Sequence, residues 1–444
     1  MSFTSPVFLF AFLPLTVIVY QLARSTKLKN IVWIAAGLLF YAFGDLRHLP
    51  LLLGSCLLHY GAGRYLMART KARRAVLLSC VALDLAVLAF YKVRGALPLG
   101  ISFYTFQAIS YVADTYKNPA DGTKNLREAL QYLTFFPQLT AGPFLKFSAL
   151  RPYLDRGDVS WEKNAQGVRR FVCGLCKKVL LSTAAAKLAD AMFSLASIDA
   201  LGAWTGALGY CLQLYFDFSG YSDMALGLGL LFGVQLPENF RHPYCAGSVS
   251  EFWRRWHMTL SGWFRDYVYI PLGGSRNGRA RTVFNKLLVF LATGLWHGTG
   301  WTFVLWGLWH GVFCGAETLL DRKHTLQTHW YGHVYTLLVV IFGFVLFRAE
   351  SVPQALMLLR AMLTGFAPVD ACRLALRNLL TAGTVFWCLA GVLACLPLWE
   401  HAKARFDGSR WFSPALDALT IVGLLLCLMQ LASHSFQPFI YASF

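Results

Sequence analysis

The chain has 444 residues, of which 57% are hydrophobic and only 14% are charged, and its formal net charge is +18. Soluble globular domains carry roughly 25% charged residues, so this composition excludes that class. The excess of Lys and Arg suits cytoplasmic loops and anionic headgroups. Because the basic residues lie in short clusters between apolar runs, we expect membrane lipids as partners and no nucleic acid.

Apolar runs long enough to cross a ~30 Å hydrocarbon core recur along nearly the whole chain, and the alternating pattern of a membrane β-barrel is missing. The sequence predicts an all-α polytopic membrane protein with roughly 11–13 membrane helices, some of them broken or re-entrant. No linker divides the chain, so we expect a single domain over residues 1–444. The predicted segments are 5–22, 31–44, 49–66, 75–91, 98–116, 126–146, 171–195, 203–235 (one or two helices), 283–298, 300–319, 332–348, 376–397 and 413–431.

The N-terminal segments indicate how the chain is oriented. The first has no basic residue before it and no small-residue cleavage site after it, so we expect a retained helix. Basic clusters at 24–29 and 69–74 follow the first and third segments, whereas the intervening turn, GDLRHLP, is nearly neutral. The positive-inside rule then places these two connections in the cytoplasm and the N-terminus outside.

Two early stretches carry polar residues in an apolar frame. GISFYTFQAISYVADTYK (100–117) contains Gln107 and Asp114, and FFPQLTAGPF (135–144) contains Gln138. The prolines of the second stretch predict broken helices, which often line a passage through a membrane protein.

The only CxxC motif of the chain joins Cys173 and Cys176. A structural zinc site needs four ligands, and neither a second pair of cysteines nor a suitably spaced pair of histidines completes this one. We therefore expect no metal and interpret the eleven cysteines as small core residues.

Asp217 and Asp223 lie in the apolar stretch YFDFSGYSDMALGLGLLFG, residues 215–233. Six residues correspond to about 240° of helix rotation, so the two carboxylates need not converge. We expect each to pair with an arginine from 248–281 or to cap a helix that begins near Ser219. A serine nucleophile is disfavoured because GYSDM lacks the final glycine of a GxSxG elbow.

The segment 248–286, SVSEFWRRWHMTLSGWFRDYVYIPLGGSRNGRARTVFNK, mixes short apolar stretches with basic residues and tryptophans. This composition predicts a helix that lies in the cytoplasmic interface or dips from it into the fold. It suits lipid anchoring, and it also suits a mouth that attracts an anionic substrate. Within it, Arg254 and Arg255 precede His257 and would favour a neutral imidazole, as a proton acceptor requires.

The pentapeptide GLWHG occurs twice, at 294–298 and 307–311, and places His297 and His310 among tryptophans and glycines. On one unbroken helix the two rings would lie about 140° and ~20 Å apart, too far to serve one reacting group. The intervening GTG at 298–300 predicts a break between two segments. A neutral imidazole at membrane depth can act as a general base, whereas a hydrogen-bonded packing role is the alternative for each ring.

Together, these stretches resemble the membrane-bound O-acyltransferase (MBOAT) family in its bacterial branch. The alginate O-acetyltransferases and related exopolysaccharide O-acetylation proteins form the most similar subgroup, and the resemblance covers roughly residues 97–350. The C-terminal FIYASF departs from the family pattern, in which FIYFQF is expected. The matching stretches are PLGISFYTFQAISYVADTYK, FFPQLTAGPF, YFDFSGYSDMALGLGLLFGVQLPENFRHPY, SEFWRRWHMTLSGWFRDYVYIPLGGSR, GLWHGTGWTFVLWGLWHG and FVLFRAES.

The resemblance implies a helical funnel around a membrane-embedded tunnel, with His297 as the key catalytic residue. It implies a second active-site histidine in the RWH motif, His257, which would orient or donate to a developing oxyanion. His297 would act as general base on the acceptor hydroxyl or help to accept the acyl group. The candidate substrate-binding residues are Arg254, Arg255, Trp256, Trp296, Asp217, Asp223 and His310.

The expected function is transfer of an acyl group, most simply acetyl, from a cytoplasmic thioester to hydroxyls of an exported polysaccharide such as alginate or cellulose. Acetyl-CoA or an acyl carrier protein would be the donor, and no tightly bound cofactor is expected. The expected location is the bacterial inner membrane. Expected partners are an esterase-like acetyltransferase outside the cytoplasm and the polysaccharide synthesis machinery. The alternatives are a transporter or flippase for an acyl carrier or glycolipid, and a scaffold without chemistry.

Overall fold

The computed structural model describes residues 1–154, 160–321 and 325–433, so the divergent FIYASF tail lies outside the described part. The described residues form helices and no strand, which confirms the predicted all-α class. They divide into two compact units. The first contains Met1–Val172 and Tyr221–Glu238, and the second contains Cys173–Gly220 and the described residues from Asn239 onward.

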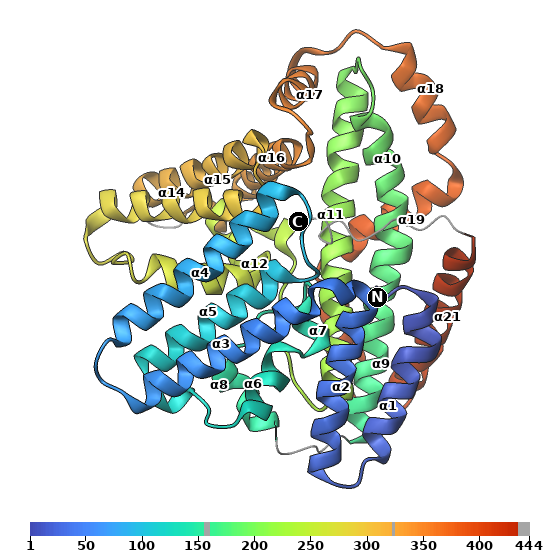
Figure 1. The fold of residues 1–444 in the computed structure, drawn as a ribbon. Helices are drawn as coiled ribbons and strands as arrows, with labels where there is room; N and C mark the ends of the chain where they lie inside the picture. The colour runs from blue at the N-terminus through green and yellow to red at the C-terminus, as the bar shows by residue number, and fades with distance from the viewer. Residues whose placement is uncertain (155–159, 322–324, 434–444) are drawn as a thin grey trace. The chain divides into compact units, whose positions relative to one another are not determined.

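The first unit is built on long helices that follow one another along the chain. In it, α3, α4 and α5 lie side by side (Figure 1). Its helices are α1 (Leu13–Leu22), α2 (Thr26–Asp45), α3 (Leu49–Ala68), α4 (Arg73–Arg94), α5 (Ile101–Lys117), α6 (Leu126–Leu133), α7 (Phe136–Leu139), α8 (Phe147–Leu150) and most of α9 (Trp161–Cys176).

A buried polar pair joins α3 to α4 in this unit. His59 Nε2 lies 2.8 Å from Asp84 Oδ2, and His59 Nδ1 lies 2.7 Å from the carbonyl oxygen of Ser55. The carbonyl can only accept, so Nδ1 carries a proton. The His59–Asp84 bond therefore contains either an imidazolium and a carboxylate or a neutral imidazole and a protonated acid. In both cases each buried side chain has a hydrogen-bond partner in the other.

The predicted segment 126–146 folds as broken helices, as its prolines predicted. Helix α6 ends at Leu133, and α7 begins at Phe136 with Pro137 in its first turn. Gln138 Nε2 donates to the carbonyl oxygen of Tyr132 at 2.9 Å. The side chain thus provides a hydrogen-bond donor for a backbone carbonyl group next to the helix break.

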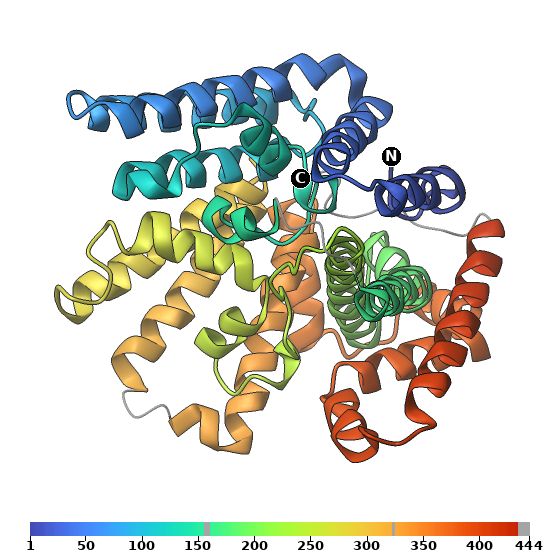
Figure 2. The same cartoon turned by 90° about the horizontal axis from the view of Figure 1, so that it is seen from below.

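The second unit holds the histidines of the sequence motifs. Helices α14, α15 and α16 lie side by side in it, and α12 packs on α15 and α16 (Figures 1 and 2). The helices that belong wholly to this unit are α10 (Thr183–Phe193), α12 (Val249–Arg255), α13 (Met258–Phe264), α14 (Gly278–His297), α15 (Trp301–Leu320), α16 (Trp330–Arg348), α17 (Val352–Thr364), α18 (Asp370–Leu379), α19 (Ala382–Ala394), α20 (Leu398–Phe406) and α21 (Phe412–Ala432).

The segment 203–235, left open between one helix and two, forms the single helix α11 (Ala200–Leu231), which contributes residues to both units. The segment 248–286 differs from the single interfacial helix that was predicted. It folds as α12 and α13, separated at His257, followed by a π-helical turn, Arg265–Tyr269, and the start of α14. Ser248 caps α12 by accepting from the backbone N–H of Glu251 at 3.1 Å.

Several helices have the length and composition to cross a membrane. Among the described residues five qualify, or six if the bent pair α18–α19 counts as one span. Helices α4 and α21 expose most of their apolar side chains, as expected of surfaces that face lipid. The chain is a multi-pass helical membrane protein. Other predicted segments are shorter in the structure: the segment 98–116, for example, becomes α5, which begins only after Gly100 and has 17 residues.

The doubled GLWHG has a packing explanation. Gly294 of α14 and Gly307 of α15 are the first glycines of the two copies, and they face each other across the antiparallel α14–α15 pair. A Cβ on Gly307 would lie 2.5 Å from the carbonyl oxygen of Phe290 and 3.4 Å from the Cα of Gly294. Small residues let the backbones approach, and such contact drives helix association inside a bilayer.

We expect Gly307→Ala to destabilise the protein by about 1–3 kcal/mol, because the added methyl group meets backbone that cannot yield. Thermal unfolding in detergent would measure the effect. Gly61→Ala on α3 is the matched control, because a Cβ there meets nothing within 4 Å and alanine favours the helix. Equal stability of the two variants would argue against close α14–α15 packing.

Candidate active site

His297 is the last residue of α14, immediately before the GTG turn that separates α14 from α15. His297 is buried, with only 4% of its surface exposed. Three aromatic rings surround the imidazole, with centroids 4.8 Å away for Trp296, 5.1 Å for Trp306 and 5.0 Å for Phe347. The predicted break at 298–300 is thus confirmed, and it places this ring at a helix end inside an apolar cage.

His310 lies on α15, and the ring centroid of Trp306 is 5.3 Å from its imidazole. Trp253 of α12 contacts it at 5.0 Å, and a Cβ on Gly343 of α16 would come within 2.5 Å of its Nε2. The residue is fully buried, and neither ring nitrogen has a hydrogen-bond partner within residues 1–154, 160–321 and 325–433. The structure thus brings both GLWHG histidines into contact with one tryptophan, Trp306.

His257 occupies the break between α12 and α13 with a left-handed backbone, φ +44°. Its Nδ1 lies 3.1 Å from Asn239 Oδ1, which also accepts from the backbone N–H of Thr259 at 3.2 Å. Because that oxygen accepts from a backbone donor, the Nδ1 of His257 must donate to it. The neutral ring therefore carries its lone pair on Nε2, a tautomer that suits a proton acceptor better than the expected donor to an oxyanion.

The ring of His257 packs on Phe218, with centroids 4.6 Å apart. Burial lowers the pKa of His257 to about 3, because the apolar surroundings disfavour the charged form. The imidazole is therefore neutral at physiological pH. Desolvation produces this state, whereas the sequence suggested the neighbouring arginines as its cause.

We expect His257 to make stability fall on acidification. Its folded pKa of about 3 is below the ordinary 6.5, so stability is fully present above pH 6.5 and is lost as pH falls towards 3, where only the unfolded chain binds the proton. Between pH 7.5 and 5 the loss should be about 2 kcal/mol greater in the wild type than in His257→Asn. Asparagine tolerates the left-handed backbone. Parallel stability curves for the two proteins would contradict the assignment.

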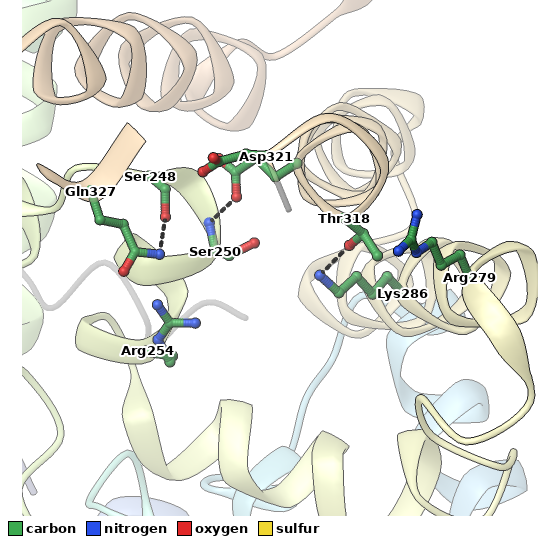
Figure 3. Close-up of a pocket in the computed structure, with 9 residues that line it drawn as sticks. Ser248, Ser250, Arg254, Arg279, Lys286, Thr318, Asp321 and Gln327 are labelled. Atoms are coloured by element: carbon green, nitrogen blue, oxygen red, sulfur yellow. Dashed lines mark hydrogen bonds between the residues drawn. The ribbon is translucent and has the colours of Figure 1, made fainter. Parts of the chain in front are cut away.

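The two arginines before His257 have different surroundings. The Arg255 guanidinium pairs with Glu251, Nη2 to Oε1 at 2.6 Å. Arg254 is exposed and lines a pocket with residues of α14 and α15 (Figure 3). Trp256 is buried against Phe252 and Phe344, with ring centroids at 5.5 and 5.2 Å. Of these three candidate substrate-binding residues, Arg254 is exposed, Arg255 is partly buried and Trp256 is buried.

The prediction that Asp217 and Asp223 pair with arginines from 248–281 is wrong. Asp217 pairs with the buried Lys178, and Asp223 pairs with Arg170 at 2.6 Å; neither basic residue lies in 248–281. Helix α11 is continuous through Ser219, so no helix begins there to be capped. Asp223 lies in the first unit, and the other candidate residues lie in the second.

Sequence reasoning missed the residues that hold the imidazoles in place. Trp306 and Phe347 enclose His297, Asn239 sets the tautomer of His257, and Gly343 abuts His310. Trp306 lies within the GLWHG region, but its ring contacts come from tertiary packing, which no local pattern reveals. Among the described residues, no three His, Cys, Asp or Glu side chains are grouped to hold a metal ion.

Comparison with known proteins places these residues in a family. Residues 117–358 match the model of the membrane-bound O-acyltransferase (MBOAT) family. The chain is 36% identical to the probable alginate O-acetylase AlgI of Pseudomonas putida over the full length of both proteins. It is 40% identical to that of Pseudomonas fluorescens over 80% of this chain and 74% of that protein.

The peptidoglycan O-acetyltransferase of Helicobacter pylori is 35% identical over 84% of this chain and 81% of that protein. The family match covers more than half of the chain and contains His257, His297 and His310. The chain therefore belongs to the membrane-bound O-acyltransferase family and is an O-acyltransferase.

Proposed function

We propose that the protein transfers acetyl groups from a cytoplasmic thioester to hydroxyls of an exported polysaccharide, with His297 as the general base. The similarity to probable alginate O-acetylases over the full chain supports an acetyl group and a polysaccharide such as alginate. The observation that carries the chemical part is His297 itself, a buried imidazole enclosed by Trp296, Trp306 and Phe347.

In the proposed step, the oxygen of the acceptor hydroxyl attacks the carbonyl carbon of the thioester. At the same time, a ring nitrogen of His297 takes the proton of that hydroxyl. The C–O bond forms, the C–S bond breaks, and the imidazolium returns the proton to the leaving thiolate. Aromatic walls exclude water, which would otherwise compete with the hydroxyl for the acyl group. The chain thus needs only a proton carrier and a dry cavity for this exchange.

The position of His297 at the end of α14 favours this role. The carbonyl ends of a helix carry partial negative charge, and they stabilise a nearby cation by about 0.3–1 kcal/mol, or ~2 kcal/mol when partly buried. The imidazolium exists only after the proton has moved, so this stabilisation acts on the transition state more than on the resting enzyme.

The distribution of basic residues supports a cytoplasmic side for the donor. Arg276, Arg279 and Arg281 precede or begin α14, and the positive-inside rule assigns that end to the cytoplasm. His297, at the other end of the helix, then lies toward the outer side of the bacterial inner membrane. There the hydroxyls of the polysaccharide would receive the acetyl group, close to the esterase-like partner and the polysaccharide machinery.

The test is genetic complementation in an alginate-producing bacterium that lacks its own O-acetylase. Expression of this chain should restore base-labile acetyl esters to the exported polymer. Membrane-inserted protein with unacetylated polymer would contradict the proposed acceptor. Repeating the assay in a cellulose-exporting strain would then show whether another polymer is the substrate.

A further inference from the structure

The CxxC motif of the sequence has no part in the proposed acyl transfer. Cys173 and Cys176 lie one helical turn apart on α9; Cys173 is exposed and Cys176 is partly buried. The interpretation of the cysteines as small core residues therefore does not fit Cys173. The structure brings a third cysteine to this motif, because the Sγ of Cys427 on α21 lies 3.6 Å from the Sγ of Cys176. Two thiols that are 251 residues apart in the sequence thus meet in the second unit.

Cys427 lies where α21 joins the second unit. It is the one buried residue of α21, a helix whose residues are all described. The neighbouring Leu426 and Met429 are exposed, which is expected of a surface that faces lipid. Helix α21 packs on the π-helical turn Lys177–Ser182, which begins directly after Cys176 (Figure 1). The pair of thiols therefore joins a lipid-facing helix to the helix behind it.

The two sulfur atoms are close enough to be linked without unfolding either helix. A disulfide has an S–S distance of about 2.05 Å, so the sulfurs of Cys176 and Cys427 need to approach by about 1.5 Å. Small rotations of the two cysteine side chains and a slight shift of α21 can supply this movement. Because α21 is bound on one side only, it can make such a shift at low cost.

The surroundings of the pair determine which oxidant can reach it. Cys176 is partly exposed, whereas Cys427 is buried, so Cys176 is the sulfur that a reagent meets first. The exposed apolar side chains of α21 favour contact with lipid over contact with water. A lipid-soluble oxidant that accepts two electrons, such as a quinone, suits this position better than a water-soluble one.

We propose that Cys176 and Cys427 form a site of reversible oxidation, at which a lipid-soluble quinone converts the two thiols into a disulfide that ties α21 to α9. The sulfur of Cys176 adds to the quinone, and the sulfur of Cys427 then attacks the sulfur of Cys176. The S–S bond forms as the bond from sulfur to the quinone breaks. The electron pair and the two thiol protons leave on the quinol, and a dithiol reductant reverses the reaction by thiol–disulfide exchange.

Thiol mapping in phosphatidylcholine nanodiscs tests the proposal without any measurement of acyl transfer. The probe is decylubiquinone, whose fully substituted ring does not retain thiols as stable adducts, and oxygen is excluded. Treatment should remove two of the eleven thiols of the chain and give a peptide that links Cys176 to Cys427 in mass spectrometry. Dithiothreitol should restore both thiols. The matched control is Cys173→Ser, one turn away on the same helix, which should give the same linked peptide.

Two variants show which cysteines react. Cys176→Ser and Cys427→Ser should each keep all of their remaining thiols after treatment. The quinone should also raise the thermal unfolding temperature of the wild type, because the cross-link restrains α21, and should leave that of both variants unchanged. Absence of the linked peptide from the treated wild type would overturn the proposal. Loss of Cys173 and Cys176 together in Cys427→Ser would also overturn it, since the CxxC motif would then be the oxidised pair.

Discussion

His297→Ala should abolish acetyl transfer while the protein still inserts and folds. General-base catalysis typically contributes about 10²–10⁴-fold in rate, and removing the imidazole removes this contribution. The loss should appear in kcat, because the proton moves only in the chemical step. The loss of kcat can be measured as the release of free thiol from acetyl-CoA by the purified protein in the presence of a saccharide acceptor.

Two further variants separate chemistry from packing. His297→Gln keeps a polar side chain of similar size inside the cage but cannot accept the proton, so it should lose as much activity as the alanine variant. His333→Ala on α16 removes an exposed histidine and should leave the rate unchanged. A glutamine variant with wild-type kcat would show that His297 only fills space.

Asp217→Leu should destabilise the protein by about 3–5 kcal/mol, the second large effect we expect, because it removes the carboxylate that pairs with the buried Lys178 ammonium. The residues are 2% and 3% exposed for Lys178 and Asp217, so water cannot replace the lost carboxylate. Thermal unfolding in detergent and the yield of folded protein both report the change.

A double-mutant cycle identifies the cause. Lys178→Met combined with Asp217→Leu replaces both charges by apolar groups and should recover most of the lost stability. Asp223→Asn is the matched control on the same helix. Its partner Arg170 is 37% exposed and also pairs with Glu238 at 2.7 Å, so we expect a loss of only about 1 kcal/mol. If the double variant is no more stable than Asp217→Leu alone, loss of the ion pair is not the reason for the lower stability of Asp217→Leu.

Local sequence features predicted the helical class, two of the helix breaks and the buried histidines. The glycines of GTG predicted the end of α14, and prolines predicted the break between α6 and α7. Both effects act within a few residues, which is why a single sequence reveals them. The close approach of Gly294 and Gly307 explains why the pentapeptide occurs twice: each copy supplies one side of the same helix contact.

Long-range partners were predicted poorly. The basic partners of Asp217 and Asp223 lie 39 and 53 residues earlier in the chain. From the sequence we expected these partners in the basic segment that follows. The αL conformation of His257 was also missed, since no glycine or proline marks the break between α12 and α13. Its stabilising bond comes from Asn239, which is distant from the RWH motif in sequence.

Reconstituted vesicles test the central role of His297 most directly. Acetyl-CoA labelled in its acetyl group would be supplied on the cytoplasmic side and alginate on the other, with wild type and His297→Ala compared. We expect ester-linked label on the saccharide with the wild type and label that stays on the thioester with the variant. Transfer by His297→Ala at the wild-type rate would contradict this expectation.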